Sequence, residues 1–128
     1  MFIKTTGVIG IAIIISLFSI EALAMSPQSF DKKLDEWASF GPESLNLSDK
    51  INSAILSGDT ANACKYQKRA IVLIKKGIAL GKELISGIDA GALEANKDNK
   101  QLRSMLVSAT ALAELNLVGV ESIDTKCQ

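Results

Sequence analysis

The sequence predicts an all-α protein: a small antiparallel bundle of about four helices with one disulfide bond, preceded by a cleaved signal peptide. Three observations lead to this prediction. Beyond residue 24 the apolar residues recur at helical spacing, and no alternating stretch is long enough for a strand. The first 24 residues have the composition of an export leader. The chain contains two cysteines, one in the middle and one near its end.

The leader has the three parts of a secretory signal. A cationic start at Met1–Lys4 precedes an apolar run at Val8–Ile20, and alanines stand at 22 and 24. The uncharged stretch from Thr5 to Ile20 is shorter than the roughly 20 residues that cross a bilayer. We therefore expect residues 1–24 to be removed, leaving residues 25–128 as one helical-bundle domain with no stable membrane anchor. The periplasm is the expected destination and the extracellular medium the alternative; an uncleaved anchor is the competing interpretation.

The two cysteines, Cys64 and Cys127, are expected to form a disulfide because exported proteins meet an oxidising environment. Their bond would close a loop of about 63 residues, which stabilises a small domain by about 4 kcal/mol in the chain-entropy model. Free thiols are the alternative. A bond between these positions also requires that the helices beside them run antiparallel, since parallel helices would hold the sulfur atoms tens of ångströms apart.

The first half of the domain is expected to hold two helices. Ser29–Phe40 has apolar residues on one face and should end at the Gly41-Pro42 pair. Ser48–Ser57 should form a second, shorter helix that ends at Gly58.

A long helix is predicted from Thr60 to Ser86, with Asp59 as its N-cap and Gly87 at its end. Its apolar half contains a central line of small residues that includes Gly77 and Gly81. Because glycine costs about 1 kcal/mol in a helix, we interpret both as sites of close helix packing. A kink at Gly77 is the other interpretation.

The opposite side of this helix is basic, with six cations against Glu83 as the one acidic residue. We interpret this basic face as either a solvated surface or a docking site for an acidic partner or anionic surface. Its residues are Lys65, Lys68, Arg69, Lys75, Lys76 and Lys82.

The last helix is predicted from about Asp98 to Gly119 and is apolar on two sides. Such a helix lies either at the centre of its bundle or at an interface. We expect the central position, with the first helix covering the second apolar face; homodimerisation or partner binding through that face is the alternative. The second face consists of Val107, Ala111, Leu115 and Val118.

Composition favours binding over catalysis. The 14 basic and 14 acidic residues balance, which argues against a nucleic-acid binder. The chain has no histidine, no phosphate-binding glycine loop and no cysteine cluster, so we expect no catalytic residues, metal site or cofactor. The sequence thus predicts a small exported non-enzymatic protein that binds another protein, such as an inhibitor or immunity protein, or an adaptor or chaperone. A self-associating structural protein of the envelope is the alternative.

Overall fold

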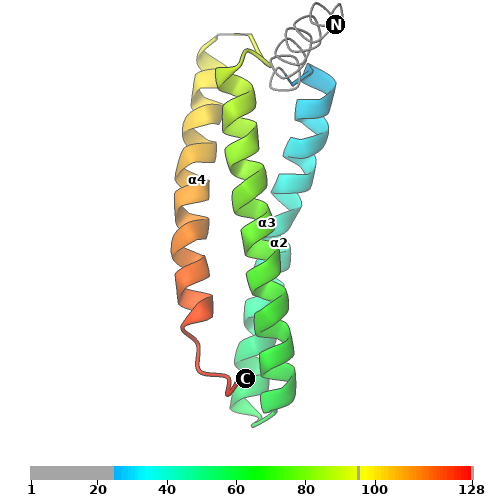
Figure 1. The fold of residues 1–128 in the computed structure, drawn as a ribbon, viewed down its shortest axis with the longest axis vertical. Coiled ribbons are helices and arrows are strands. Elements are labelled where there is room, and N and C mark those ends of the chain that lie inside the picture. Colours follow the sequence, from blue (N-terminus) through cyan, green and yellow to red (C-terminus); the bar gives the residue numbers. More distant parts are fainter. Residues whose placement is uncertain (1–24, 95, 128) are drawn as a thin grey trace, which may run out of the picture.

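Three long helices make up the fold. The computed structural model describes residues 25–94 and 96–127, so the predicted leader lies outside the described residues. The helices α2 (Pro27–Leu56), α3 (Thr60–Asp89) and α4 (Lys97–Glu121) run antiparallel in succession, with α3 between the other two (Figure 1). The all-α class and the antiparallel order are confirmed, but the described residues form three helices rather than about four.

The predicted break at Gly41-Pro42 is wrong, because α2 continues through it with Pro42 inside the helix. Proline removes one backbone hydrogen bond and crowds the preceding turn, which ordinarily ends a helix. Here the inward-facing residues keep a seven-residue spacing across the proline, so packing against α3 continues on both sides of it. Tertiary packing of one continuous stripe outweighs the local signal. The two rows are Phe30, Trp37, Ser44 and Ile51, and Phe40, Leu47 and Ala54.

Polar side chains begin each helix. Ser26 accepts a hydrogen bond from the backbone N–H of Ser29 at 3.1 Å, and Asp59 accepts one from Asn62 at 3.2 Å. The predicted N-cap of the long helix is therefore confirmed. Asn96 caps α4 in the same way, accepting from the backbone N–H of residue 99 at 2.9 Å. These bonds satisfy donors that have no partner within the helix.

The long helix does not end at Gly87, as predicted, but continues to Asp89. Gly87 is buried, and a Cβ there would lie 3.2 Å from the Met25 Cε and 3.6 Å from the Phe30 ring. The glycine thus allows the start of α2 to approach α3. The chain turns two residues after the helix, at Gly91, where φ is +92°.

The core is divided into two clusters, each containing residues of all three helices. The cluster near the disulfide end consists of Leu47, Ile51, Ala70, Ile74, Ile78 and Val120. The cluster at the other end consists of Phe30, Leu84, Ala92 and Leu106, with Trp37 packed against it. Each helix is held at both ends of the molecule, and the region between the clusters contains the two glycines of the small-residue line.

Gly77 and Gly81 are sites of close packing within a continuous helix. A Cβ on Gly77 would lie 3.3 Å from the Phe40 ring of α2. A Cβ on Gly81 would lie 2.5 Å from the Thr110 Oγ1 of α4 and 3.2 Å from the Trp37 Nε1 of α2. Gly81 is therefore the point where both neighbouring helices approach the backbone of α3 together.

Replacement of Gly81 by alanine is expected to lower the free energy of unfolding by about 1–2 kcal/mol. Overpacking against Thr110 and Trp37 outweighs the gain of about 1 kcal/mol in helix propensity. Gly119→Ala is the matched control, because a Cβ there meets nothing within 4 Å and should stabilise α4 by up to about 1 kcal/mol. Urea denaturation of both variants measures the difference, and equal stabilisation by the two alanines would contradict the packing role of Gly81.

The central helix is α3 and not, as predicted, the last helix. The extensive helix–helix contacts join α2 to α3 and α3 to α4. Because α2 packs on α3, it does not cover the second apolar face of α4, and Leu115 and Val118 on that face are 69% and 65% exposed. The sequence expectation failed because α3 contains the glycines that let two helices approach it at once.

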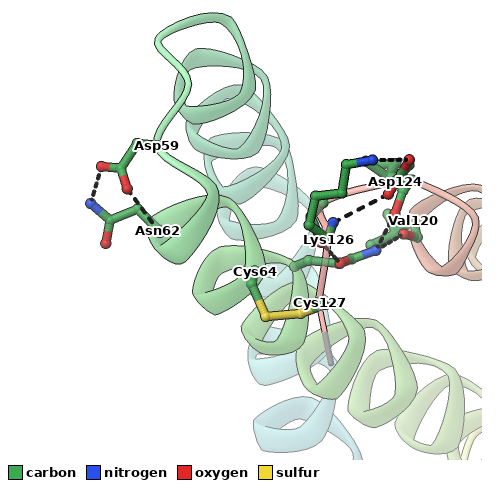
Figure 2. The surroundings of a disulfide bond; sticks show 10 residues. Asp59, Asn62, Cys64, Val120, Asp124, Lys126 and Cys127 are labelled. Atoms are coloured by element: carbon green, nitrogen blue, oxygen red, sulfur yellow. Dashed lines mark hydrogen bonds and ion pairs between the residues drawn. A yellow bond between two sulfur atoms is a disulfide. The ribbon is translucent and has the colours of Figure 1, made fainter.

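The disulfide joins Cys64 in the second turn of α3 to Cys127 in the segment after α4, with the Cα atoms 5.1 Å apart (Figure 2). This pairing confirms the predicted bond and the antiparallel relation of the two helices. The bond encloses 63 positions of the chain and holds the C-terminal segment against the start of α3.

Gln67 holds the same segment by hydrogen bonds. Its side chain is 5% exposed and donates to the backbone carbonyls of Val120 at 2.8 Å and Ile123 at 2.9 Å. The hydroxyl of Thr125, which is 3% exposed, donates to the Gln67 Oε1. The buried amide of Gln67 therefore provides hydrogen-bond partners for the segment that leads from α4 to Cys127.

Candidate binding faces on α3 and α4

The outer face of α4 is the side that points away from α3, and it is apolar and uncovered. It consists of the predicted self-association residues Val107, Ala111, Leu115 and Val118, all of them exposed. The structure thus places these four residues together on one surface. Leu112, at the edge of this face, is 61% exposed. Exposed apolar residues that gather on one helix face are typical of interaction surfaces.

Charge is almost absent from the outer face. Between Ser104 and Val120 the one charged residue of α4 is Glu114. Lys97, Asp98, Lys100 and Arg103 precede this stretch, and Glu121 follows it. The helix therefore presents a largely apolar centre between charged ends.

Within the described parts of the chain, α4 is the helix that is long and apolar enough to cross a membrane. This property rests on length and composition alone, and 17% of the most apolar window of α4 is buried in the structure. The side chains that face α3, with Leu106 and Thr110 among them, are buried, and the residues of the outer face are exposed.

Ion pairs hold α4 along α3. Arg103 donates from Nε to the Asp89 Oδ1 at 2.7 Å and from Nη2 to Oδ2 at 3.0 Å. These hydrogen bonds, together with the charge of the guanidinium, lower the pKa of Asp89. Farther along, the Lys82 Nζ lies 3.9 Å from a Glu114 carboxylate oxygen. With the disulfide at the other end, these contacts fix which side of α4 faces solvent.

A groove runs between α2 and α4 and has α3 as its floor. Two hollows of about 300 and 290 Å³ follow one another along it and share Ser44, Ile74 and Asn116. The first is lined by Trp37 of α2 and Leu112 of α4, among other residues. Sequence reasoning did not identify this groove or the exposure of Leu112, and both follow from α2 packing chiefly on α3.

The six cations of the basic face are all exposed along α3, and Lys82 among them reaches Glu114 of α4: Lys65, Lys68, Arg69, Lys75, Lys76 and Lys82. The structure thus brings them together on one surface. Among the described residues Lys82 is the one member that forms an ion pair. Lys68, Arg69 and Lys76 border a shallow hollow of about 340 Å³ that also includes Glu43 of α2 and Val72.

Titratable groups of the described chain form surface pairs rather than a reactive cluster. The pKa of Asp124 is lowered chiefly because its carboxylate accepts a hydrogen bond from the backbone N–H of Lys126. Among residues 25–94 and 96–127, no group of three or more potential metal ligands comes together.

Comparison of the chain with protein-family models, with curated proteins and with solved structures finds no match.

Proposed function

We propose that this chain is a small exported non-enzymatic protein that binds another protein through the outer face of α4. The observation that carries the proposal is the exposure of Leu112, Leu115 and Val118, each more than 60% accessible on a helix that is otherwise packed against its neighbour. Exposure of apolar side chains is unfavourable by about 25 cal/mol for each Å² left in water, so covering this face with a partner provides a driving force for binding.

The surface and the composition both favour binding over catalysis. The chain contains no histidine, and its shifted carboxyl groups, Asp89 and Asp124, are solvent-exposed members of local pairs. General acid–base catalysis relies on groups held in a cleft with altered pKa values. An inhibitor or immunity protein, or an adaptor or chaperone, needs only a rigid binding face.

Export is part of the proposal. The leader composition supports it, and so does the disulfide, because such bonds persist in oxidising compartments. We propose the periplasm as the site of action, with the extracellular medium as the alternative. A structural role in the envelope through self-association would use the same face of α4.

The basic face of α3 is a second candidate surface, for an acidic partner. The observation that favours it is the exposure of five cations that have no ion-pair partner among the described residues. Such a cluster accelerates association with an acidic protein. Binding there would weaken as salt is added, whereas binding to the outer face of α4 would depend less on salt.

Photo-crosslinking distinguishes which of the two surfaces binds the partner. A photo-crosslinking amino acid is placed at one position at a time in cells that export the protein. Leu115 reports on the outer face of α4, Arg69 on the basic face, and Asp35, an exposed residue of α2, is the control. We expect a specific adduct from position 115. An adduct from position 69 alone would move the binding site to α3. Absence of adducts above the Asp35 level from both test positions would overturn the proposed function.

A further inference from the structure

Val72 lies at the centre of the basic face of α3. It is 53% exposed and is the one exposed large apolar residue of this helix. Residues three and four positions apart are neighbours on a helix surface. All four positions at this distance from Val72 hold exposed cations, namely Lys68, Arg69, Lys75 and Lys76. These four residues form a cation ring around an exposed valine.

The shallow hollow of about 340 Å³ between α2 and α3 adjoins the cation ring. Its apolar lining consists of Leu47 of α2 and of Val72 and Leu73 of α3, and Leu47 is only 5% exposed. The hollow therefore has an apolar base and a charged rim, with room for one large apolar side chain. An apolar centre inside a ring of polar residues is typical of the residues that dominate binding at protein interfaces.

Negative charge from the chain itself does not neutralise the cation ring. The protein has 14 basic and 14 acidic residues, yet the ion pairs of the described residues include no member of the ring. Lys65, one turn earlier, adds like-charged pairs with Lys68 and Arg69, and such pairs destabilise a helix. Departures from local stability of this kind are expected at functional sites.

Acidic residues lie around the cation ring and limit what can bind there. Glu43 of α2 lies on the rim of the hollow, Glu83 lies two turns beyond Lys76 along α3, and Glu121 of α4 borders a second hollow beside Lys68. A bilayer or a nucleic acid presents negative charge over a wider area and would meet these carboxylates as well. The charges therefore favour a short acidic segment over an extended polyanion.

We propose that the cation ring and its hollow bind a short acidic helix of the partner protein. One large apolar side chain of that helix enters the hollow beside Val72, and carboxylates three and four positions on either side of it meet the cations. The spacing of the two helices matches because both follow the same geometry, whereas an extended segment would turn alternate side chains away. This inference rests on the proposed function, since it requires that the chain bind another protein, and it adds a site separate from the outer face of α4.

The probe is a fluorescently labelled helical peptide of alanine and glutamine. It carries one central leucine and glutamates three and four positions on either side of it. Fluorescence anisotropy should give a dissociation constant of about 100 µM at about 20 mM salt, because surface ion pairs contribute little each. Binding should weaken about tenfold at about 200 mM salt. A control peptide of the same composition, with its glutamates on the side opposite the leucine, should bind about fivefold more weakly.

Charge variants test which cations are used, and all the altered positions are exposed, so the helical circular dichroism should be kept. Lys68→Gln/Lys76→Gln should weaken binding of the peptide about fivefold. Lys97→Gln/Lys100→Gln makes the same change of net charge on α4 and should alter the affinity less than about twofold. Glu43→Gln should strengthen binding about twofold, because it removes the carboxylate on the rim of the hollow.

Val72→Ala should weaken binding about threefold at both salt concentrations, since it removes apolar contact and no charge. Equal binding of the two peptides would overturn the proposed geometry. Tighter binding of anionic phospholipid vesicles or of duplex DNA, lost in Lys68→Gln/Lys76→Gln, would assign the ring to a polyanion and overturn the proposal. A peptide that does not bind at about 1 mM would overturn the site, and if position 115 then crosslinks to a partner, the proposed function stands without it.

Discussion

Removal of the Cys64–Cys127 bond is expected to lower the free energy of unfolding by about 4 kcal/mol. The bond closes a loop of 63 positions, and loop closure reduces the entropy of the unfolded chain by an amount that grows with loop length. Small domains have a total stability of about 5–15 kcal/mol, so the loss is a large part of it. We also expect the C-terminal segment to separate from α3 before the helices do.

Urea denaturation of the Cys64→Ser/Cys127→Ser variant measures this loss. The original chain, reduced with a thiol reagent, is the control and should unfold at a similar urea concentration. An unchanged midpoint in both samples would show that the bond does not stabilise the fold. Two alkylatable thiols in the protein purified without reductant would show that the bond is absent.

Replacement of Gln67 by leucine is expected to lower the free energy of unfolding by about 2–3 kcal/mol. The leucine fits the apolar surroundings, but it removes the donor to the Val120 and Ile123 carbonyls and the acceptor of the Thr125 hydroxyl. A buried polar group left without its partner costs about 1–3 kcal/mol. Because these bonds hold the segment next to Cys127, we also expect the disulfide of the variant to be reduced faster.

Thr125→Val is the matched control, since it removes the hydroxyl and leaves both bonds from the Gln67 amide in place. It should cost about 1 kcal/mol. Urea denaturation under non-reducing conditions measures both variants. If Gln67→Leu is as stable as the original chain, the buried hydrogen bonds contribute nothing to the attachment of the C-terminal segment.

The elements that follow from local chemistry could be predicted from the sequence. Asp59 marks the start of α3, and the helical spacing of apolar residues gives α3 and α4 to within a few residues. The disulfide followed from the number of cysteines and from the antiparallel order that its geometry requires. The helix start and the helix spans depend on residues close in sequence, and two cysteines allow only one pairing within the chain.

The elements that depend on packing between helices could not be predicted in the same way. Pro42 is tolerated because α2 packs against α3 on both sides of it, and Gly87 serves as a contact for Met25 rather than as a helix end. Gln67 offered one signal, a polar residue between Ala63 and Ala70 in the buried stripe of α3. Its partners, which belong to the chain after α4, are visible only in the fold.

The candidate surfaces could likewise be predicted only in part. The residues of both surfaces could be identified from the sequence, since helical periodicity groups the cations of α3 and the second apolar face of α4. Whether the α4 face is covered depends on which helix is central. That is decided by the close approach at Gly81, where Trp37 and Thr110 meet α3 from either side.

The exposure of the outer face of α4 in the single copy is the claim on which the proposed function depends. It is measured by NMR of methyl-labelled protein, at a concentration low enough for the monomer, in the presence of a soluble paramagnetic gadolinium complex. The signals of Leu115 and Val118 should broaden strongly while those of the buried Leu84 and Leu106 stay sharp. If Leu115 and Val118 are as protected as Leu106 in the monomer, the face is covered within the chain and cannot be the binding surface.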